Sequence, residues 1–338
     1  MTTIGIMGFG RIGRNLFRLL YKRDDIRIGG VCEIADPASA EYLLRFDTLS
    51  GRFPDPLSLK DGSLNVCGRQ IPLLAGWERG AIPDWKSLGV DTVVEATNRS
   101  QKRADLEKHL AAGAQRVILC TLPAEPLDLM VVPGVTDGAL SAAHRIVSNG
   151  TPTIQGLAPL VKILLEGFGI DRLMFTTLHE YTSHHRLADV PSEDMRRGRS
   201  APENIVPQES RTPAILMDLF PELKEKVLGA AMNVPVPNGS SVDLVCWHKK
   251  KVTVDALNEV VRTAAGSRWE GILDWTQDPI VSSDVAGSRF SGIFDSKATM
   301  VLGENLSKTL LWFDAGWAYT YRLVDLLDRF LVLDKEAR

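Results

Sequence analysis

The sequence predicts an α/β protein of two domains: a parallel sheet covered by helices, followed by an α+β domain with a mostly antiparallel sheet. In the first half, short apolar runs alternate with segments of helical periodicity, as strands and helices do around a parallel sheet. From about residue 150 onward, longer runs alternate polar and apolar residues, which is typical of antiparallel strands with one covered face. A chain of 338 residues is long enough for both domains.

The predicted elements follow this division in order. The first domain, residues 1–149, contains short apolar strands, and the second domain, residues 150–316, contains longer amphipathic strands. The segment 184–212 is rich in Arg, Pro, Ser and Glu, and a loop of that length is usually functional or part of an interface. The predicted strands are 3–7, 28–32, 91–96, 116–120, 172–179 and 240–247, and the predicted helices are 11–21, 102–112 and 317–333.

Composition and charge exclude several classes of protein. A net charge of -3 gives no field that would attract nucleic acid or an anionic membrane surface. No apolar stretch approaches the roughly 20 residues that span a bilayer, and the amino terminus lacks a signal peptide. Four scattered cysteines without a CxxC pair argue against a disulfide framework or a zinc site. We therefore expect a soluble, cytoplasmic protein.

A glycine-rich turn follows the first predicted strand and opens the first predicted helix. Gly8, Gly10 and Gly13 form a GxGxxG pattern, whose glycines allow a tight turn, close approach of a pyrophosphate and close helix–strand packing. Arg11 and Ile12 complete the pattern, and the helix start presents N–H groups and partial positive charge to phosphates. The alternative is a glycine turn with a purely structural purpose.

Glu33 lies twenty residues beyond Gly13, at the end of the second predicted strand. A carboxylate at this place accepts hydrogen bonds from the adenosine ribose hydroxyls and repels a 2′-phosphate. The alternative is a solvated acid at a strand end. The order of strand, turn, helix, strand and acid favours a Rossmann domain that binds NAD rather than NADP.

Further motifs recur along the chain to its end. They are Tyr42 to Asp47 with 51–53, Val93 to Thr97, 146–149 leading into 157–159, Thr176 to Thr182, Val234 to Asn238 with 242–244, and 294–299. Together with the turn from Gly8 to Arg14, they resemble the glyceraldehyde-3-phosphate dehydrogenase family. The resemblance implies an NAD-binding Rossmann domain, a catalytic and oligomerisation domain, a terminal helix (317–338) that completes the first domain, and a homotetramer.

The position of the nucleophile departs from this family. The family's cysteine lies four residues after the serine of a Ser-Asn pair, which here is Ser148 and Asn149. Counting forward from Ser148 and backward from Leu157 gives the same register and places Pro152 at the cysteine position. Oxidation of an aldehyde to an acyl phosphate needs a thiolate that forms a hemithioacetal, from which hydride leaves. Proline has no nucleophilic atom, so the family's reaction is not expected of this chain.

His179 stands at the position of the family's general base. It is either a working acid–base group or a residue held by local hydrogen bonds after the thiol was lost. The spacing of His179, His184 and His185 does not present three ligands on one helical face, so we expect no metal site.

The resemblance also implies positions that bind two phosphates. Asn233 stands where the family has an arginine, so the bidentate phosphate contact of a guanidinium is missing. Arg211 either restores a positive charge or makes a surface contact. The candidate hydroxyl ligands of the phosphates are Thr151, Thr153, Thr182 and Ser210.

The nicotinamide end of the cofactor site is also altered. Ala315 replaces the family's asparagine that holds the carboxamide, whereas Tyr319 is retained. Thr97 and Thr121 are further candidate cofactor contacts, and Cys120 is either an inert strand cysteine or a redox thiol. Because alanine cannot orient the carboxamide, the adenine half of the site is better preserved than the nicotinamide half.

These observations leave three hypotheses. The first is an NAD-binding pseudoenzyme that has lost thiol-dependent aldehyde oxidation and has a regulatory or assembly role with an unidentified protein partner. The second is a redirected NAD-dependent oxidoreductase that uses His179 as acid–base without a covalent intermediate. The third is an oligomeric scaffold with vestigial nucleotide binding. Glu33 and the glycine turn argue against the third, and Ala315 with Asn233 argues against the second.

Overall fold

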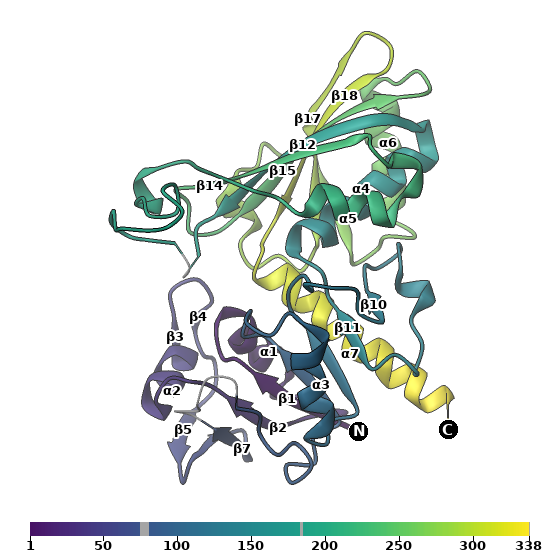
Figure 1. The fold of residues 1–338 in the computed structure, drawn as a ribbon. Coiled ribbons are helices and arrows are strands. Elements are labelled where there is room, and N and C mark those ends of the chain that lie inside the picture. The colour runs from purple at the N-terminus through teal and green to yellow at the C-terminus, as the bar shows by residue number, and fades with distance from the viewer. Residues whose placement is uncertain (75–80, 183–184, 338) are drawn as a thin grey trace. The chain divides into compact units, whose positions relative to one another are not determined.

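The computed structural model describes residues 1–74, 81–182 and 185–337. The chain forms two compact units (Figure 1). The first unit contains Met1–Val131, Thr136–Thr151 and Thr320–Arg338, and the second contains Val132–Val135 and Pro152–Tyr319. One unit holds a mostly parallel sheet and the other a mostly antiparallel sheet, which confirms the predicted fold class.

A nine-stranded sheet forms the centre of the first unit, with the strand order β10-β11-β9-β8-β1-β2-β7-β6-β5. Neighbouring strands from β10 to β7 are parallel, and β6 and β5 add an antiparallel edge. The chain leaves β1 for β2 on one side and later returns to β8 on the other. The boundary between β1 and β8 is therefore a topological switch point, where open α/β sheets bind ligands beyond the carboxyl ends of their strands.

The bounds of the strands in this unit are β1 (Thr2–Met7), β2 (Ile26–Cys32), β5 (Leu57–Lys60), β6 (Ser63–Val66), β7 (Arg69–Leu74), β8 (Thr92–Glu95), β9 (Arg116–Leu119), β10 (Leu129–Met130) and β11 (Ile146–Ser148), with the separate pair β3 (Phe46–Asp47) and β4 (Gly51–Arg52). The helices are α1 (Arg11–Leu20), α2 (Pro37–Arg45), α3 (Arg103–Ala111), the short η1 (Asp137–Ala139) and α7 (Trp317–Glu336), which begins in the second unit.

The core of the first unit explains why its strands are short and apolar. Helix α1 buries Leu16, Phe17 and Leu20 on one side, while Ile4 and Ile6 of β1 have no exposed surface. Both faces of a parallel sheet are covered, so a central strand needs apolar residues at every position rather than at alternate ones.

A seven-stranded sheet forms the centre of the second unit, with the order β13-β14-β12-β15-β18-β17-β16. Its strands are β12 (Ile170–Glu180), β13 (Val206–Gln208), β14 (Val227–Val234), β15 (Ser240–His248), β16 (Leu273–Thr276), β17 (Gly292–Leu302) and β18 (Leu306–Phe313). Its helices are α4 (Pro152–Phe168), α5 (Thr212–Leu219), α6 (Val254–Ala265) and the short η2 (Ala201–Glu203), η3 (Pro221–Leu223) and η4 (Ser282–Val285).

Helices α4, α5 and α6 pack on this sheet. Along β12, Leu173, Phe175 and Thr177 are buried, whereas Met174 is exposed and Thr176 is half-buried. This alternation is the pattern expected of a sheet with one helix-covered face.

The segment 184–212 is less irregular than the sequence indicates. Val206–Gln208 forms β13, which pairs antiparallel with β14, and Thr212 is the first residue of α5. A three-residue strand that contains a proline is too short to show a period-two pattern, so its pairing depends on the neighbouring strand. His184 lies outside the described residues.

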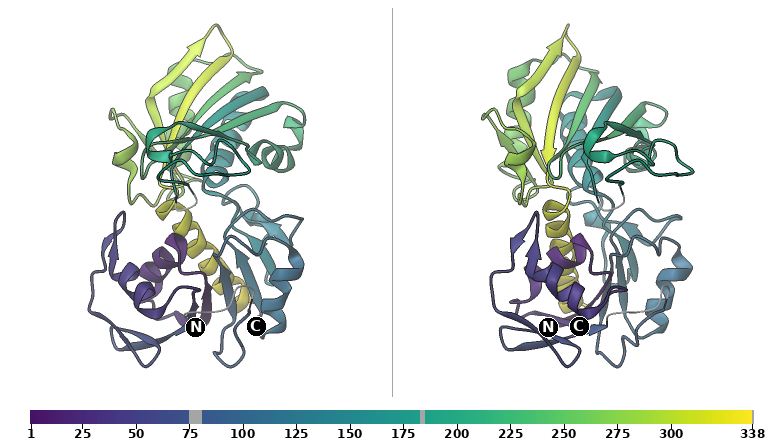
Figure 2. Two further views of the ribbon diagram at one scale, coloured as in Figure 1. Left: turned by 60° about the vertical axis from the view of Figure 1, so that its left-hand side comes forward. Right: turned by 90° about the vertical axis from the view of Figure 1, so that its left-hand side faces the viewer.

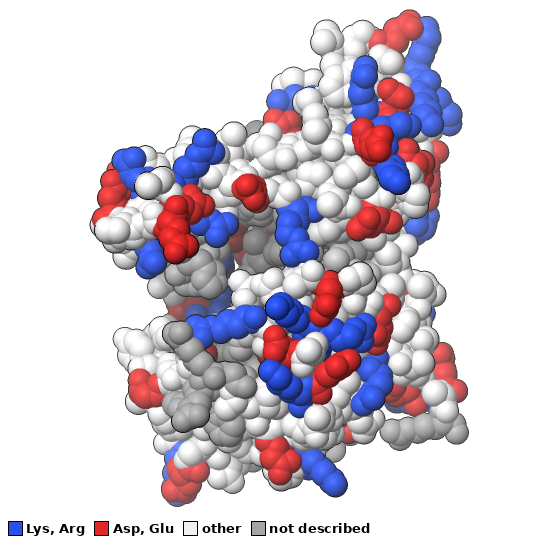
Figure 3. All heavy atoms as spheres, in the orientation of Figure 1, with Lys and Arg blue, Asp and Glu red and all other residues white. Residues whose placement is uncertain are grey.

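Charged side chains show no large single-sign region on the face drawn in Figure 3, where Lys and Arg are interspersed with Asp and Glu. This distribution agrees with the small net charge of -3. Within the described parts of the chain, every helix is too short or too polar to cross a membrane.

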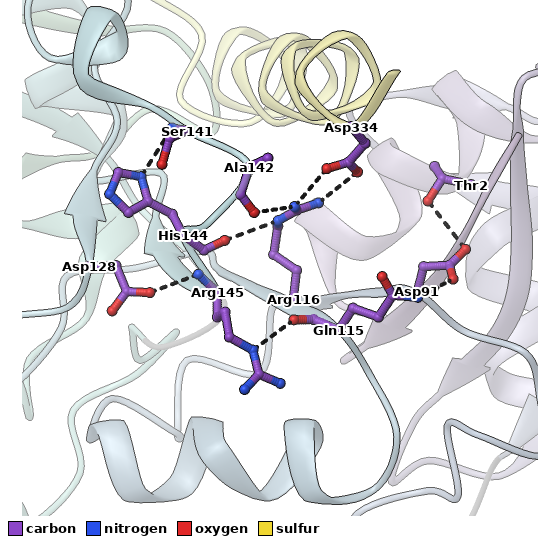
Figure 4. A network of polar contacts seen from close by, with 10 residues as sticks. All are labelled: Thr2, Asp91, Gln115, Arg116, Asp128, Ser141, Ala142, His144, Arg145 and Asp334. Atoms are coloured by element: carbon purple, nitrogen blue, oxygen red, sulfur yellow. Dashed lines mark hydrogen bonds and ion pairs between the residues drawn. The ribbon is translucent and has the colours of Figure 1, made fainter. Parts of the chain in front are cut away.

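The last helix is anchored to the first sheet through Arg116 at the start of β9 (Figure 4). Its guanidinium donates to both carboxylate oxygens of Asp334 on α7, at 3.1 and 3.0 Å, and to the carbonyls of Ala142 and His144. It also stacks on Phe330 of α7, with 3.7 Å between the guanidinium carbon and the ring centroid. Figure 2 shows α7, in yellow, running along the strands of this unit.

Replacing Arg116 should destabilise the first unit. Arg116→Met keeps the apolar stem but leaves Asp334 and two carbonyls without their donor, so the free energy of unfolding in urea should fall by about 2–3 kcal/mol. Lys108→Met is a matched control, because its ion pair with Asp105 on α3 is exposed and contributes less than about 0.5 kcal/mol. Equal losses in the two variants would show that Arg116 does not anchor α7.

Candidate dinucleotide and catalytic sites

The glycine turn connects β1 to α1 and has two different packing requirements. Gly8 has a φ of 96°, and a Cβ on it would lie 2.9 Å from the carbonyl carbon of Ala96 and from the nitrogen of Thr97. A Cβ on Gly13 would lie 2.1 Å from the carbonyl oxygen of Gly8. Gly10, in contrast, has no atom within 4 Å of such a Cβ, so the backbone there is open to a ligand. This is the division of roles expected of a phosphate-binding turn.

Glu33 follows β2 and is bound to this turn by a hydrogen bond. One carboxylate oxygen accepts from the N–H of Phe9 at 2.8 Å, and the other accepts from the N–H of Ile34 at 2.7 Å and of Ala35 at 3.3 Å. A carboxylate has about four acceptor positions, so Glu33 retains acceptor capacity for a hydroxyl group. The predicted ribose ligand therefore lies directly beside the predicted pyrophosphate turn.

Two threonines predicted as cofactor contacts belong to the same edge of the sheet. Thr97 follows β8, and Thr121 follows β9. The strands β9, β8, β1 and β2 are neighbours, and their carboxyl ends meet at one edge. The structure thus brings Gly8, Gly10, Glu33, Thr97 and Thr121 to a single edge, with Arg11 and Ile12 opening α1 beside them.

Pro152 opens helix α4 in the second unit. Proline suits the first position of a helix, because its N–H would have no partner inside the helix and its φ is already helical. The helix therefore forms without the thiol. Thr151, just before α4, is half-buried, and Thr153, in the first turn, is buried.

His179, near the end of β12, faces a hydroxyl group. Its Nε2 lies 3.4 Å from Oγ1 of Thr153, and its ring meets the edge of Phe313 at 6.4 Å between centroids. Burial, reinforced by the nearby His185, lowers the pKa of His179 to about 4. The imidazole is neutral near pH 7 and faces the hydroxyl of Thr153, the residue after Pro152.

His185 is a site residue that the sequence interpretation missed, except as a rejected metal ligand. Its Nδ1 accepts from the backbone N–H of Thr182 at 2.9 Å, and its Nε2 contacts the side-chain amide of Asn233. A backbone N–H can only donate, so Nδ1 is an acceptor and the proton of the neutral ring lies on Nε2, which faces the side-chain amide of Asn233. One imidazole thus joins two of the residues predicted to bind phosphate.

The other predicted phosphate ligands have local roles. The hydroxyl of Ser210 accepts from the N–H of Thr212 at 3.3 Å, at the start of α5, and Arg211 is exposed. No group of three or more His, Cys, Asp or Glu that could hold a metal occurs among the residues that the structure describes.

Ala315 lies in a turn that its neighbour Asp314 holds in place. The buried Asp314 carboxylate accepts from the N–H groups of Gly316, Trp317 and Gly287 and from the amide of Asn238, at 2.7–3.0 Å. Tyr319, in the first turn of α7, is buried. The turn is therefore ordered without any contribution from a side-chain amide at position 315.

None of the three cysteines in or next to strands has the properties of a replacement nucleophile. Burial, with the charges of Glu33 and Glu95, raises the pKa of Cys32 to about 12. Burial also raises the pKa of Cys246, and burial with the charge of Glu95 raises the pKa of Cys120. Such thiols stay protonated at neutral pH and react slowly. Cys67 is exposed, in the turn between β6 and β7.

The lowered pKa of His179 predicts an acid-dependent loss of stability. In the unfolded chain His179 binds a proton below about pH 6.5, whereas in the folded chain it binds one only below about pH 4. Acidification from pH 6.5 to pH 4 therefore lowers the free energy of unfolding by up to roughly 3 kcal/mol. His179→Gln should flatten this part of the stability curve in urea titrations. Above pH 7 both proteins should show parallel curves, and an unchanged slope between pH 6.5 and pH 4 would contradict the prediction.

Comparison with known proteins agrees with both units. Residues 2–103 match the family described as "Glyceraldehyde 3-phosphate dehydrogenase, NAD binding domain", and residues 152–315 match "Glyceraldehyde 3-phosphate dehydrogenase, C-terminal domain". A "Glyceraldehyde-3-phosphate dehydrogenase 2" of Streptomyces avermitilis is 41% identical over 325 residues, 96% of each chain. The "Glyceraldehyde-3-phosphate dehydrogenase" of Geobacillus stearothermophilus is 41% identical over 324 residues, 96% of each chain. That of Borreliella burgdorferi is 39% identical over 335 residues, 97% of this chain and 99% of the relative. The chain belongs to the glyceraldehyde-3-phosphate dehydrogenase family, and its first domain is the family's NAD-binding domain.

Proposed function

We propose that this protein binds NAD but does not oxidise aldehydes through a thiol, and that it acts in its dinucleotide-bound form in regulation or assembly with a protein partner. The proposal rests on Pro152, which begins α4 and to which the count from Ser148 assigns the family's nucleophile position. Thiol-dependent oxidation transfers hydride from a hemithioacetal, which forms only after a protein thiolate has added to the aldehyde. Neither Pro152 nor the three strand cysteines with raised pKa supplies one.

The phosphate-binding positions support the same proposal. Asn233 is 2% exposed and bound to His185, which in turn binds Thr182. His185 therefore holds both the side chain of Asn233 and the backbone N–H of Thr182. A phosphorylated aldehyde that bound at Asn233 would have to compete with His185 and would find no guanidinium at residue 233.

A redirected oxidoreductase remains the second candidate, because His179 is retained beside the hydroxyl of Thr153. An efficient general base has a pKa near the working pH. At a pKa of about 4, the neutral His179 is a weak base for removing a proton from an alcohol. This value favours the first candidate, and Ala315 gives no amide to orient a nicotinamide for stereospecific hydride transfer.

We also propose that the protein is a homotetramer in the cytoplasm. The sheet face of the second unit opposite its helices carries half-buried apolar side chains, Val245, Trp247, Leu310 and Trp312. Partly exposed apolar surface of this kind is typical of an interface. Leu228, on the other side of β12 from β15, is 69% exposed.

Glu33 should set the choice between NAD and NADP. Glu33→Gln removes the charge that repels a 2′-phosphate. Its NH₂ group replaces one oxygen and loses the backbone hydrogen bonds on that side, which weakens the binding of both dinucleotides, so the prediction concerns their ratio. The ratio of the NADP to the NAD dissociation constant should fall about tenfold in calorimetric titrations. Asp36→Asn is the matched control. It removes a nearby exposed charge, while its side-chain oxygen can still cap α2 at Ser39. An unchanged ratio in Glu33→Gln would contradict the assignment of Glu33 to the ribose.

The proposal is tested directly by assaying the protein with NAD, glyceraldehyde 3-phosphate and inorganic phosphate. We expect NAD to bind and no NADH to form. Pro152→Cys should then gain a slow, iodoacetamide-sensitive activity, and adding Asn233→Arg should raise kcat/KM by about tenfold, because a bidentate phosphate contact is restored.

All these proteins should carry Cys67→Ser, because the exposed Cys67 thiol would otherwise consume the alkylating reagent. Iodoacetamide-sensitive turnover by the chain with Pro152 intact would overturn the proposed loss of activity. Failure of NAD to bind would instead favour a scaffold without a nucleotide function.

A further inference from the structure

A buried chain of polar side chains runs beneath the glycine turn of the first unit. The indole N–H of Trp85 donates to Nδ1 of His109 at 2.9 Å, and Nε2 of His109 lies 3.2 Å from Oε2 of Glu95. The other oxygen of Glu95 accepts from the backbone N–H of Thr97 at 2.8 Å and from its hydroxyl. Trp85 and His109 have no exposed surface, and Glu95 is 1% exposed.

The direction of each hydrogen bond in this chain is fixed by chemistry. An indole nitrogen can only donate, so Nδ1 of His109 must be the acceptor. A neutral imidazole has one N–H, which therefore lies on Nε2 and points at Glu95. Both oxygens of Glu95 then accept hydrogen bonds, and every donor in the chain has a partner.

The position of the indole is fixed as well. Trp85 packs on the backbone of Gly5 in β1, where a Cβ would lie 2.6 Å from the indole ring. Trp85 also belongs to the apolar cluster that contains Met7, Cys32 and Val93. The sheet thus holds the first donor of the chain in one orientation.

The other end of the chain reaches the glycine turn. The backbone of Glu95 is tied to the sheet, because its carbonyl accepts from the N–H of Cys120 at 2.9 Å. Its side chain turns back to hold Thr97, and the peptide between Ala96 and Thr97 lies against Gly8, 2.9 Å from a Cβ placed there. Movement of Thr97 would therefore change the shape of the turn that receives the pyrophosphate.

We propose that Trp85, His109 and Glu95 are positioning residues for the dinucleotide: they lock one histidine tautomer, and through it the Glu95 carboxylate holds the Ala96–Thr97 peptide against Gly8. This inference rests on the dinucleotide binding of the first domain and not on the proposed loss of catalysis. The three residues would thus support NAD binding from inside the core, because all three are buried.

The critical variant is Glu95→Gln, because a carboxamide has one acceptor and one donor side. If its oxygen faces Thr97, its NH₂ meets the Nε2–H of His109, and Trp85 prevents that ring from changing tautomer. We expect NAD to bind about tenfold more weakly, since a buried donor is left without an acceptor. The binding constant is measured by calorimetry on the full-length protein.

The double variant Trp85→Phe/Glu95→Gln tests the tautomer lock. Without the indole donor, His109 can carry its proton on Nδ1 and accept from the carboxamide on Nε2. The N–H without an acceptor then lies on Nδ1, away from residue 95 and Thr97, so NAD affinity should recover to within about threefold of the unaltered protein. The melting temperature should nevertheless fall below that of either single variant, because the indole packing is lost and the Nδ1–H has no acceptor. Recovery of affinity with falling stability is not expected of a merely structural chain.

Two further measurements complete the test. Nitrogen-15 NMR should show the proton of His109 on Nε2 in the unaltered protein and on Nδ1 in the double variant. Trp269→Phe, at a buried indole of the second unit, is the stability control and should leave NAD affinity within about twofold.

Unchanged NAD affinity in Glu95→Gln, or weaker binding in the double variant than in Glu95→Gln, would overturn the proposal. If the unaltered protein binds no NAD, the dinucleotide function fails instead. Amide exchange of Thr97 in the ligand-free protein then still decides the positioning role: faster exchange in Glu95→Gln supports it, and unchanged exchange refutes it.

Discussion

The first domain depends on one close contact, the approach of the start of α1 to the end of β1. A Cβ on Gly13 would stand 2.1 Å from the carbonyl oxygen of Gly8, so the strand and helix meet at a distance that only glycine permits. Gly8 is in turn pressed against the peptide between Ala96 and Thr97 at the end of β8. Glu33 is oriented from the same turn, through the N–H of Phe9. The positions of Glu33 and of the Ala96–Thr97 peptide at the carboxyl edge of the sheet therefore depend on this contact.

The start of α4 in the second domain has no comparable constraint. Pro152 occupies the first turn of α4, where a helix needs no N–H from the residue and where the φ of proline is already suitable. His179 keeps its place because β12 is paired on both sides, with β14 and β15, and not because a thiol faces it. Proline at residue 152 thus costs the fold little, which agrees with the 41% identity of the chain to a glyceraldehyde-3-phosphate dehydrogenase over 96% of its length.

Features that depend on local sequence were predictable, and features that join distant segments were not. The glycine turn and the strand β12 could be predicted, because the spacing of the glycines and the alternation of polar and apolar residues are visible within one short stretch of sequence. The bond of His185 to Asn233 spans 48 positions, and the pair of Arg116 with Asp334 spans 218. Even the bond of His109 to Glu95, only 14 positions apart, needs the helix and strand to be packed before the two residues can be matched. Each of these residues looks like an ordinary polar residue until its partner is known.

The glycines of the turn do not carry equal weight as evidence of nucleotide binding. Packing alone requires glycine at positions 8 and 13, whatever the domain binds, because any Cβ there would collide with backbone atoms. Gly10 has a negative φ of -68° and no atom within 4 Å of a Cβ, so neither conformation nor packing demands glycine at that position. A ligand lying on the backbone would demand it. Gly10, rather than the complete GxGxxG pattern, is therefore the residue of this turn whose presence a cofactor explains and the packing does not.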